Sequence, residues 1–287
     1  MHAITEKPIG YMIPVGEADR ERLEALGAIY NPTSMEVIKS HQIPDNPKIL
    51  DVGCGDGRLS CLYANAIKGS TVVGIDKSPE QILVSKQNAE QEHVTNISWE
   101  VCDIYHLDTL KEKHASLFDI VHTRFVLTHL DDPKKAFEQM LSMVKPGGLV
   151  IIEESGAKKK FKNTPKAIQA WEKLVELQYE LQHSYKDTIG VVRKHLSHSV
   201  NVSSYITQMF DITIEGQLQK KLFPLGVNLG LKKLEDMGKS DRILERIKEL
   251  GYEDCKTWLK DLKDFESDNS ISLEMENYEC IVAIKKQ

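Results

Sequence analysis

Between residues 48 and 154, short continuous runs of hydrophobic residues alternate with hydrophobic residues at helical spacing. Short runs of β-branched and apolar residues predict five strands, at 49–52, 71–75, 97–102, 118–122 and 149–153. Apolar residues at helical spacing fill the intervals, as in the helix predicted from Leu59 to Ala66. Alternating strands and helices are typical of βαβ units, and continuous apolar strands are typical of a sheet covered on both faces. The pattern therefore predicts a mainly parallel α/β sheet.

Local signals mark the ends of the helices between these strands. Ser78 suits an N-cap, and Pro79 suits the first helical position. Gln81 then stands where a capping box places its glutamine. The sequence Asp131-Asp132-Pro133 begins another helix, and Pro146-Gly147-Gly148 is expected to turn the chain into the next strand.

Beyond residue 154 the alternation stops, and the pattern predicts a largely helical insertion. Apolar residues at helical spacing predict helices over 168–181, 191–209 and 243–250. Two further strands are predicted at 210–214 and 278–284. With the five earlier strands they make seven.

The composition and net charge limit the classes of partner that the chain is expected to bind. The 41% hydrophobic and 28% charged residues are an ordinary globular balance, which allows a sizeable core. A formal net charge of -6 offers no general attraction to polyanions, so no nucleic-acid partner is expected.

The five cysteines lack C-x-x-C spacing, so no metal site is expected and the thiols suit a reducing compartment. No apolar run is long enough to span a bilayer. We therefore expect a cytoplasmic protein without membrane insertion, whose oligomeric state the sequence leaves open.

A glycine-rich turn follows the first predicted strand. Its glycines, at 53, 55 and 57, run G-x-G-x-G, whereas dinucleotide enzymes require G-x-G-x-x-G. Asp51 precedes the turn and would repel a diphosphate but favour an ammonium group. Asp76 ends the second strand, where a carboxylate can accept hydrogen bonds from a ribose diol. A nucleoside that carries an amino acid fits both carboxylates.

At this point residues 48–154 resemble the class I S-adenosylmethionine-dependent methyltransferases. The resemblance implies S-adenosyl-L-methionine as cofactor and an α/β, Rossmann-like seven-stranded methyltransferase sheet, mostly parallel with an antiparallel last strand, plus the helical insertion. Carried over residue by residue, it implies that the cofactor is bound by Asp51, Gly53, Cys54, Gly55, Asp76, Lys77, Gln81, Asp103, Ile104, Arg124 and Phe125. In this resemblance Asp103 and Ile104 bracket the adenine, and Thr123-Arg124-Phe125 closes over the methionine chain.

The resemblance extends more loosely outside these residues. The segment 10–17 is similar to the N-terminal arm of small-molecule methyltransferases related to the enzymes of quinone biosynthesis, in which the arm caps the cofactor. It implies that Tyr11 lines the active site. We therefore expect a helical arm over 1–47, a cofactor-binding core over 48–155, and an acceptor-side insertion with the last two strands over 156–287.

The expected reaction is methyl transfer by in-line displacement, for which orientation and exclusion of water are the main requirements. A general base would help an acceptor that must lose a proton. His129 follows the fourth strand at the ligand-binding edge and is the leading candidate, against the alternative of a histidine packed in its loop. Glu154, beside Glu153, and Tyr11 are the other catalytic candidates. Thr123-Arg124-Phe125 stands where nucleic-acid and protein amine methyltransferases carry an Asn-Pro-Pro-Tyr-like motif.

A small-molecule acceptor, methylated at oxygen, nitrogen or carbon, therefore remains. Two other classes are weighed against it. A nicotinamide oxidoreductase would need the missing glycine spacing. A non-catalytic regulatory protein that binds S-adenosylmethionine would keep every cofactor contact and show no turnover.

Overall fold

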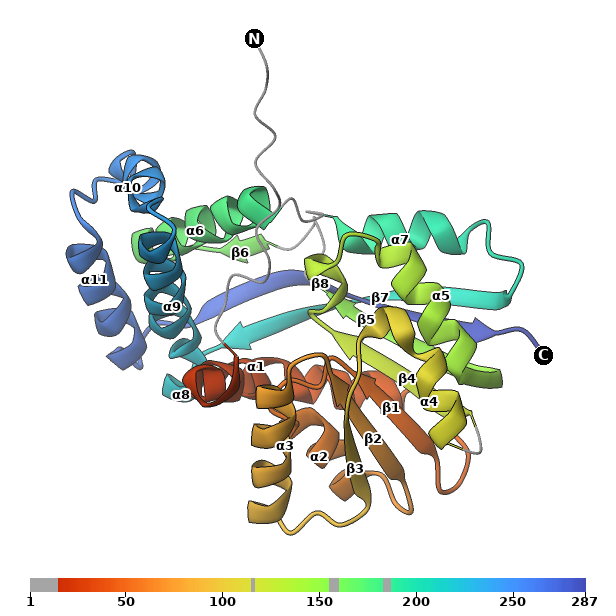
Figure 1. The fold of residues 1–287 in the computed structure, drawn as a ribbon. Helices are drawn as coiled ribbons and strands as arrows, with labels where there is room; N and C mark the ends of the chain where they lie inside the picture. The colour runs from red at the N-terminus through yellow and green to blue at the C-terminus, as the bar shows by residue number, and fades with distance from the viewer. Residues whose placement is uncertain (1–14, 115–116, 155–159, 183–186) are drawn as a thin grey trace.

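A computed structural model of the chain describes residues 15–114, 117–154, 160–182 and 187–287 (Figure 1). Within these ranges one sheet has eight strands, in the order β3-β2-β1-β4-β5-β8-β6, with β7 also paired to β8. The strands are β1 Lys48–Val52, β2 Thr71–Asp76, β3 Ile97–Val101, β4 Phe118–Arg124, β5 Val144–Glu154, β6 Lys160–Lys162, β7 Val202–Ile214 and β8 Leu273–Lys285.

The first five strands are parallel, and β8 runs antiparallel to β5, β6 and β7. The five predicted core strands and the antiparallel last strand are therefore confirmed. The predicted count of seven is too low, because the three-residue strand β6 pairs with β8 as well. Parallel strands end at one edge, so β1, β2, β4 and β5 bring their carboxyl ends together.

Helices cover both faces of the parallel sheet. The described helices are α1 Arg20–Lys39, α2 Arg58–Ala66, α3 Pro79–Gln91, α4 Asp108–Lys113, α5 Pro133–Met143, α6 Lys166–Gln182, α7 Thr188–Leu196, α8 Gln217–Lys220, α9 Leu222–Asp236, α10 Ser240–Lys248 and α11 Cys255–Ser267, with short 3-10 turns η1 Gly16–Asp19, η2 Ile104–His106 and η3 Leu127–His129. One buried cluster joins the sheet to α1, α2 and α3, and another joins its opposite face to α4, α5 and α7.

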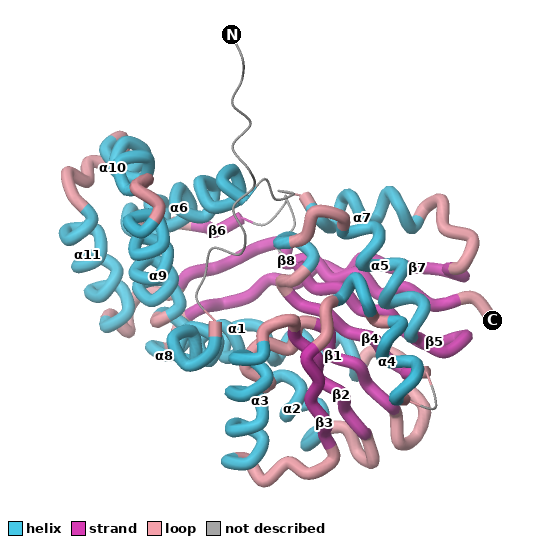
Figure 2. Tube along the Cα trace, viewed as in Figure 1, coloured by secondary structure: helices cyan, strands magenta, loops and turns pink. Residues whose placement is uncertain are grey.

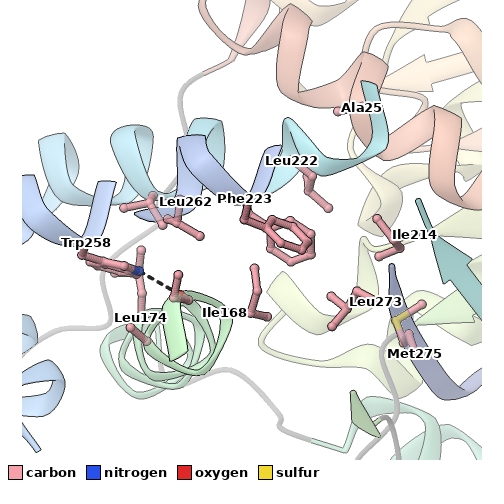
Figure 3. Packing of buried hydrophobic residues seen from close by; sticks show 14 of the residues in the cluster. Ala25, Ile168, Leu174, Ile214, Leu222, Phe223, Trp258, Leu262, Leu273 and Met275 are labelled. Atoms are coloured by element: carbon pink, nitrogen blue, oxygen red, sulfur yellow. Dashed lines mark hydrogen bonds between the residues drawn. The ribbon is translucent and has the colours of Figure 1, made fainter. Parts of the chain in front are cut away.

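A third cluster lies beyond the parallel sheet, where β7 and β8 extend among α6, α9, α10 and α11 (Figure 2). Phe223 lies at its centre between Ile168 and Leu222 (Figure 3). Trp258 is fully buried, and its Nε1 donates to the carbonyl oxygen of Ala167 at 2.9 Å. This layer holds α6 and α9 over the carboxyl-end edge of the sheet.

One predicted helix is too long. The pattern predicted a helix over 191–209, but α7 ends at Leu196 and β7 begins at Val202. The β-branched and aromatic residues of β7 pair with β8, from Val202 opposite Lys285 to Ile214 opposite Leu273. Pairing with a distant segment thus decides a conformation that local spacing left ambiguous.

The structure also differs from the prediction of a turn before the fifth strand, at 146–148. These residues lie inside β5, which begins at Val144, opposite Phe118 of β4. The pairing then shifts before Ile120 meets Leu149, so the extra residues form an irregularity within the strand. In the described part of the chain, no helix combines the length and apolar character that a membrane crossing requires.

Candidate functional site

The glycine-rich turn joins β1 to α2 at the carboxyl-end edge of the sheet. Gly53, Gly55 and Gly57 all have positive φ, at 71°, 58° and 77°. A Cβ at Gly53 would lie 2.3 Å from Val126 Cγ2, so only glycine fits there. A Cβ at Gly55 would meet Leu23 Cδ1 at 3.6 Å, which leaves this backbone open toward the cavity described below.

Asp76 binds the glycine turn to the start of α3. One carboxylate oxygen accepts the Gly55 N–H at 3.2 Å, and the other accepts the Ser78 N–H at 2.9 Å. Burial raises the pKa of Asp76 above its ordinary value, although both amides oppose the shift. A carboxylate has about four lone-pair sites, so capacity remains for a ribose diol.

Gln81 lies in the first turn of α3, where Ser78 caps the helix by accepting the Gln81 N–H. Its side chain is 4% exposed and lines the cavity, and its Oε1 has no hydrogen-bond partner among the described residues. A buried acceptor without a partner is costly unless a ligand supplies the donor. The predicted capping box is therefore only half formed, and the amide faces the expected cofactor instead.

A cavity of about 520 Å³ opens at this edge. Its sheet side is lined by Gly53, Gly55, Asp76, Lys77, Ser78, Gln81, Asp103 and Ile104, and its other side by Tyr30 of α1, Trp171, Leu174, Val175 and Tyr179 of α6, and Leu222 and Gly226 of α9. Polar groups thus line one end of the cavity, while the other end is mainly apolar and aromatic. Pockets of this size and character hold small molecules.

Asp103 and Ile104 follow β3 at the polar end. Asp103 accepts the Tyr105 N–H at 2.9 Å, which holds η2 in place. Ile104 is 6% exposed and packs in the core below the cavity, so its apolar surface forms part of the wall. Both residues line the cavity, and their contact with adenine stays a prediction.

Asp51 lies deeper than the sequence suggested. It is 3% exposed, accepts a hydrogen bond from Ser60 Oγ, and lies 3.2 Å from His122 Nδ1. It lines a smaller cavity of about 60 Å³ that shares Gly53, Gly55 and Arg124 with the larger one. Cys54 also lines only this smaller space among the described cavities, with its Sγ 3.9 Å from Ser85 Oγ.

A buried charged network connects Asp51 with the end of β5. His122 Nε2 lies 2.8 Å from Glu153 Oε1, and Glu153 also accepts from Ser34 and from Tyr278, each at 3.0 Å. Burial alone would lower the pKa of His122, but the two flanking carboxylates raise it above its usual value. The same pairing lowers the pKa of Glu153 in spite of its burial. The two flanking carboxylates therefore favour the protonated form of His122 over the neutral ring.

Arg124 ends β4 and lines both cavities, and Phe125, which follows it, lines the larger one. Arg124 donates to Ser34 Oγ and to Asn31 Oδ1, each at 2.9 Å, and so connects the site with α1. Phe125 has a φ of 56°, which is rare for an aromatic residue, and its ring meets Tyr30 edge-on with the centroids 4.8 Å apart. Such backbone strain is concentrated at functional sites.

His129 lines the cavity at the end of η3. Burial lowers its pKa to about 4, so the ring is neutral at physiological pH. Its Nδ1 lies 3.3 Å from Gln182 Oε1, an oxygen that can only accept, so this contact suits the tautomer with the proton on Nδ1. A neutral ring held in one orientation can accept a proton from an acceptor hydroxyl.

Glu154 supports this turn and is not among the described residues that line the cavity. Its Oε1 accepts the backbone N–H groups of Leu127 at 2.7 Å and Thr128 at 3.4 Å. Burial raises the pKa of Glu154 to about 8. The carboxyl group therefore holds the loop that presents Thr128 and His129 to the cavity.

Several residues that line the cavity were not predicted from the sequence. Trp171 belonged only to a predicted apolar stripe, and Tyr30, Tyr179 and Gly226 carried no motif at all. Tyr11, the third catalytic candidate, lies outside the described residues. No group of three or more metal-ligating side chains in the described part of the chain is arranged to hold a metal ion.

Comparisons with known proteins identify the family of the chain. A family model described as a methyltransferase domain matches residues 43–224. The ubiquinone biosynthesis O-methyltransferase of Coxiella burnetii is 34% identical over 124 residues, which cover 43% of this chain and 50% of that protein. The chain thus spans about half the length of the curated relatives it matches.

Two solved structures share the fold. The YcgJ protein of Bacillus subtilis superposes with a TM-score of 0.53 at 15% identity, covering 88% of this chain and 97% of its own. Phosphoethanolamine N-methyltransferase 2 of Haemonchus contortus, in complex with phosphomonomethylethanolamine and S-adenosylhomocysteine, gives 0.50 at 16% identity, covering 92% of this chain and 56% of its own. At these identities the likeness concerns the fold.

Proposed function

Because the chain belongs to the methyltransferase domain family, we propose that it transfers a methyl group from S-adenosylmethionine to a small molecule held in the apolar end of the cavity. One observation carries the proposal: a single cavity joins the glycine turn and Asp76 to an apolar compartment built by α6 and α9. A cofactor and an acceptor bound in these two parts would be neighbours.

The residues present fit the cofactor. The carboxylate of Asp76 suits a ribose diol, and the open backbone at Gly55 permits close approach. The Oε1 of Gln81, which has no partner among the described residues, could accept from the cofactor. Asp103 and Ile104 would hold the adenine. The smaller cavity, with Asp51 and Arg124, would receive the charged amino-acid end.

When bound, S-adenosylmethionine supplies a methyl group already activated by its sulfonium. The chain then has to orient the acceptor and exclude water, which can supply about 7 to 11 kcal/mol of the barrier. The α6 and α9 walls orient the acceptor, and His129, neutral and oriented by Gln182, would take the acceptor proton at Nε2. Glu154 would keep the His129 turn in place.

The name of the Coxiella relative favours oxygen as the accepting atom. A small molecule, rather than nucleic acid, and a cytoplasmic location are parts of the same proposal. The net charge of -6 and the five free cysteines support them.

The test is transfer of label from S-adenosylmethionine with a tritiated methyl group into a metabolite extract, with the product separated by chromatography. Labelled product that requires the intact chain, and that the Asp76→Ala variant makes more slowly, would support the proposal. Tight cofactor binding without labelled product from any extract would favour the non-catalytic regulatory alternative.

A further inference from the structure

Helix α9 carries two glycines, Gly226 and Gly230, among its fifteen residues. Glycine in the middle of a helix is destabilising relative to alanine, because it gives up more backbone freedom on folding. A glycine in such a place therefore either is required by the contacts around it or only lowers the stability of the fold.

Packing accounts for Gly230. A Cβ at this position would lie 2.9 Å from Gln178 Nε2 and 3.0 Å from Leu174 Cδ2, both on α6. Gly230 is also buried. The missing side chain lets α9 approach α6 closely, so Gly230 is a structural glycine.

Packing does not account for Gly226. Among the described residues, a Cβ there would meet one atom, Trp171 Nε1, at 3.6 Å, which is an ordinary van der Waals distance. Gly226 is half-buried and lines the cavity beside Trp171 of α6. An alanine would fit the protein, so what the glycine preserves is free volume in the cavity.

The walls around Gly226 indicate what fills that volume. The described lining residues of α6 and α9 are Trp171, Leu174, Val175, Gln178, Tyr179, Gln182, Leu222 and Gly226, and none is an acid, a lysine, an arginine or a histidine. The charged lining residues come from other elements: Asp76, Lys77 and Asp103 at the cofactor end, and also Arg22, Arg124 and Asp131. Arg22 is paired with Asp19, and Arg124 donates to Ser34 and Asn31. A charged group brought against the wall of α6 and α9 would lose hydration without gaining an ionic partner from that wall.

We propose that Gly226 keeps open the place where the acceptor lies beside Trp171, and that the acceptor is a neutral, mainly apolar molecule. This inference rests on the proposed function, since it assigns the occupant of the second half of the same cavity. It makes residue 226 a determinant of acceptor size.

The experiment uses two fluorescent probes on the full chain saturated with S-adenosylhomocysteine. N-phenyl-1-naphthylamine is neutral and apolar, and 1-anilinonaphthalene-8-sulfonate adds a sulfonate to the same rings. The neutral probe should bind the wild type more tightly than the sulfonate does. Gly226→Leu should weaken the neutral probe by at least about tenfold, because even one methylene can matter that much in a hydrophobic pocket. Asn228→Leu is the matched control, on the same helix at an exposed position, and should leave both affinities unchanged.

Gly226→Ala guards against a leucine variant that does not fold. It should raise the midpoint of thermal unfolding, as an alanine that fits a helix does, and weaken the neutral probe by a smaller factor. Equal affinity of the neutral probe for wild type and both Gly226 variants would overturn this inference. So would a wild type that binds the neutral probe and the sulfonate probe equally well. If the wild type bound no S-adenosylhomocysteine, the proposed function itself would fail instead.

Discussion

Asp76 offers the most quantitative test of the cofactor site. In the free chain its carboxylate already accepts from Gly55 and Ser78. Hydrogen bonds to a charged group contribute about 1.5 to 3 kcal/mol each, and some of this is recovered when water replaces a lost partner. Replacing Asp76 by alanine should therefore weaken binding of S-adenosylhomocysteine by about 1 to 3 kcal/mol, which is roughly 5- to 150-fold in Kd.

The assay is isothermal titration calorimetry on wild type, Asp76→Ala and Asp76→Asn. The asparagine keeps one acceptor oxygen, so its affinity should fall between the other two. Asp45→Ala, at an exposed position before β1, controls for loss of a carboxylate elsewhere. Thermal unfolding of each variant confirms the fold, because Asp76 also stabilises the glycine turn. An unchanged Kd in folded Asp76→Ala would refute the assignment.

Three other residues give separate tests. His129→Gln should lower kcat on a true acceptor by about 10²- to 10⁴-fold if His129 is the base, and an unchanged kcat would exclude that role. Because burial raises the pKa of Glu154 from the ordinary 4.5 to about 8, the folded chain holds its proton more tightly, so stability should fall as pH rises between these values. Glu154→Gln should lack this loss when urea unfolding is compared at pH 6 and pH 9, and parallel pH curves would contradict the shift. His122→Leu leaves two buried carboxylates facing each other and should cost about 3 to 5 kcal/mol of unfolding free energy, partly restored by adding Glu153→Gln. A loss no larger than that of an ordinary core substitution would show that His122 is not a cation.

The cofactor half of the site follows largely from local sequence. A strand, a glycine turn and a helix in succession define the loop, and an acidic residue at the end of the next strand falls beside it in any parallel sheet. Asp76, Asp103 and Ile104 line one cavity, and their binding of the cofactor stays a prediction.

The remainder depends on contacts between distant segments. Asp51 was placed correctly at the end of β1, but its pairing opposite His122 depends on strand register, which local spacing does not encode. In the same way β7 is a strand because β8 lies beside it. The apolar end of the cavity is lined by Tyr30, Trp171 and Gly226, which lie far apart in the sequence. It therefore forms only once α1, α6 and α9 have packed together.

The most direct test of the whole account is a crystal structure of this chain with S-adenosylhomocysteine. It should show adenine against Ile104, the ribose hydroxyls at Asp76, and the amino-acid end beside Gly53 and Arg124. A ligand bound elsewhere, or crystals that take up none at saturating concentration, would contradict the claim that this cavity holds the methyl donor.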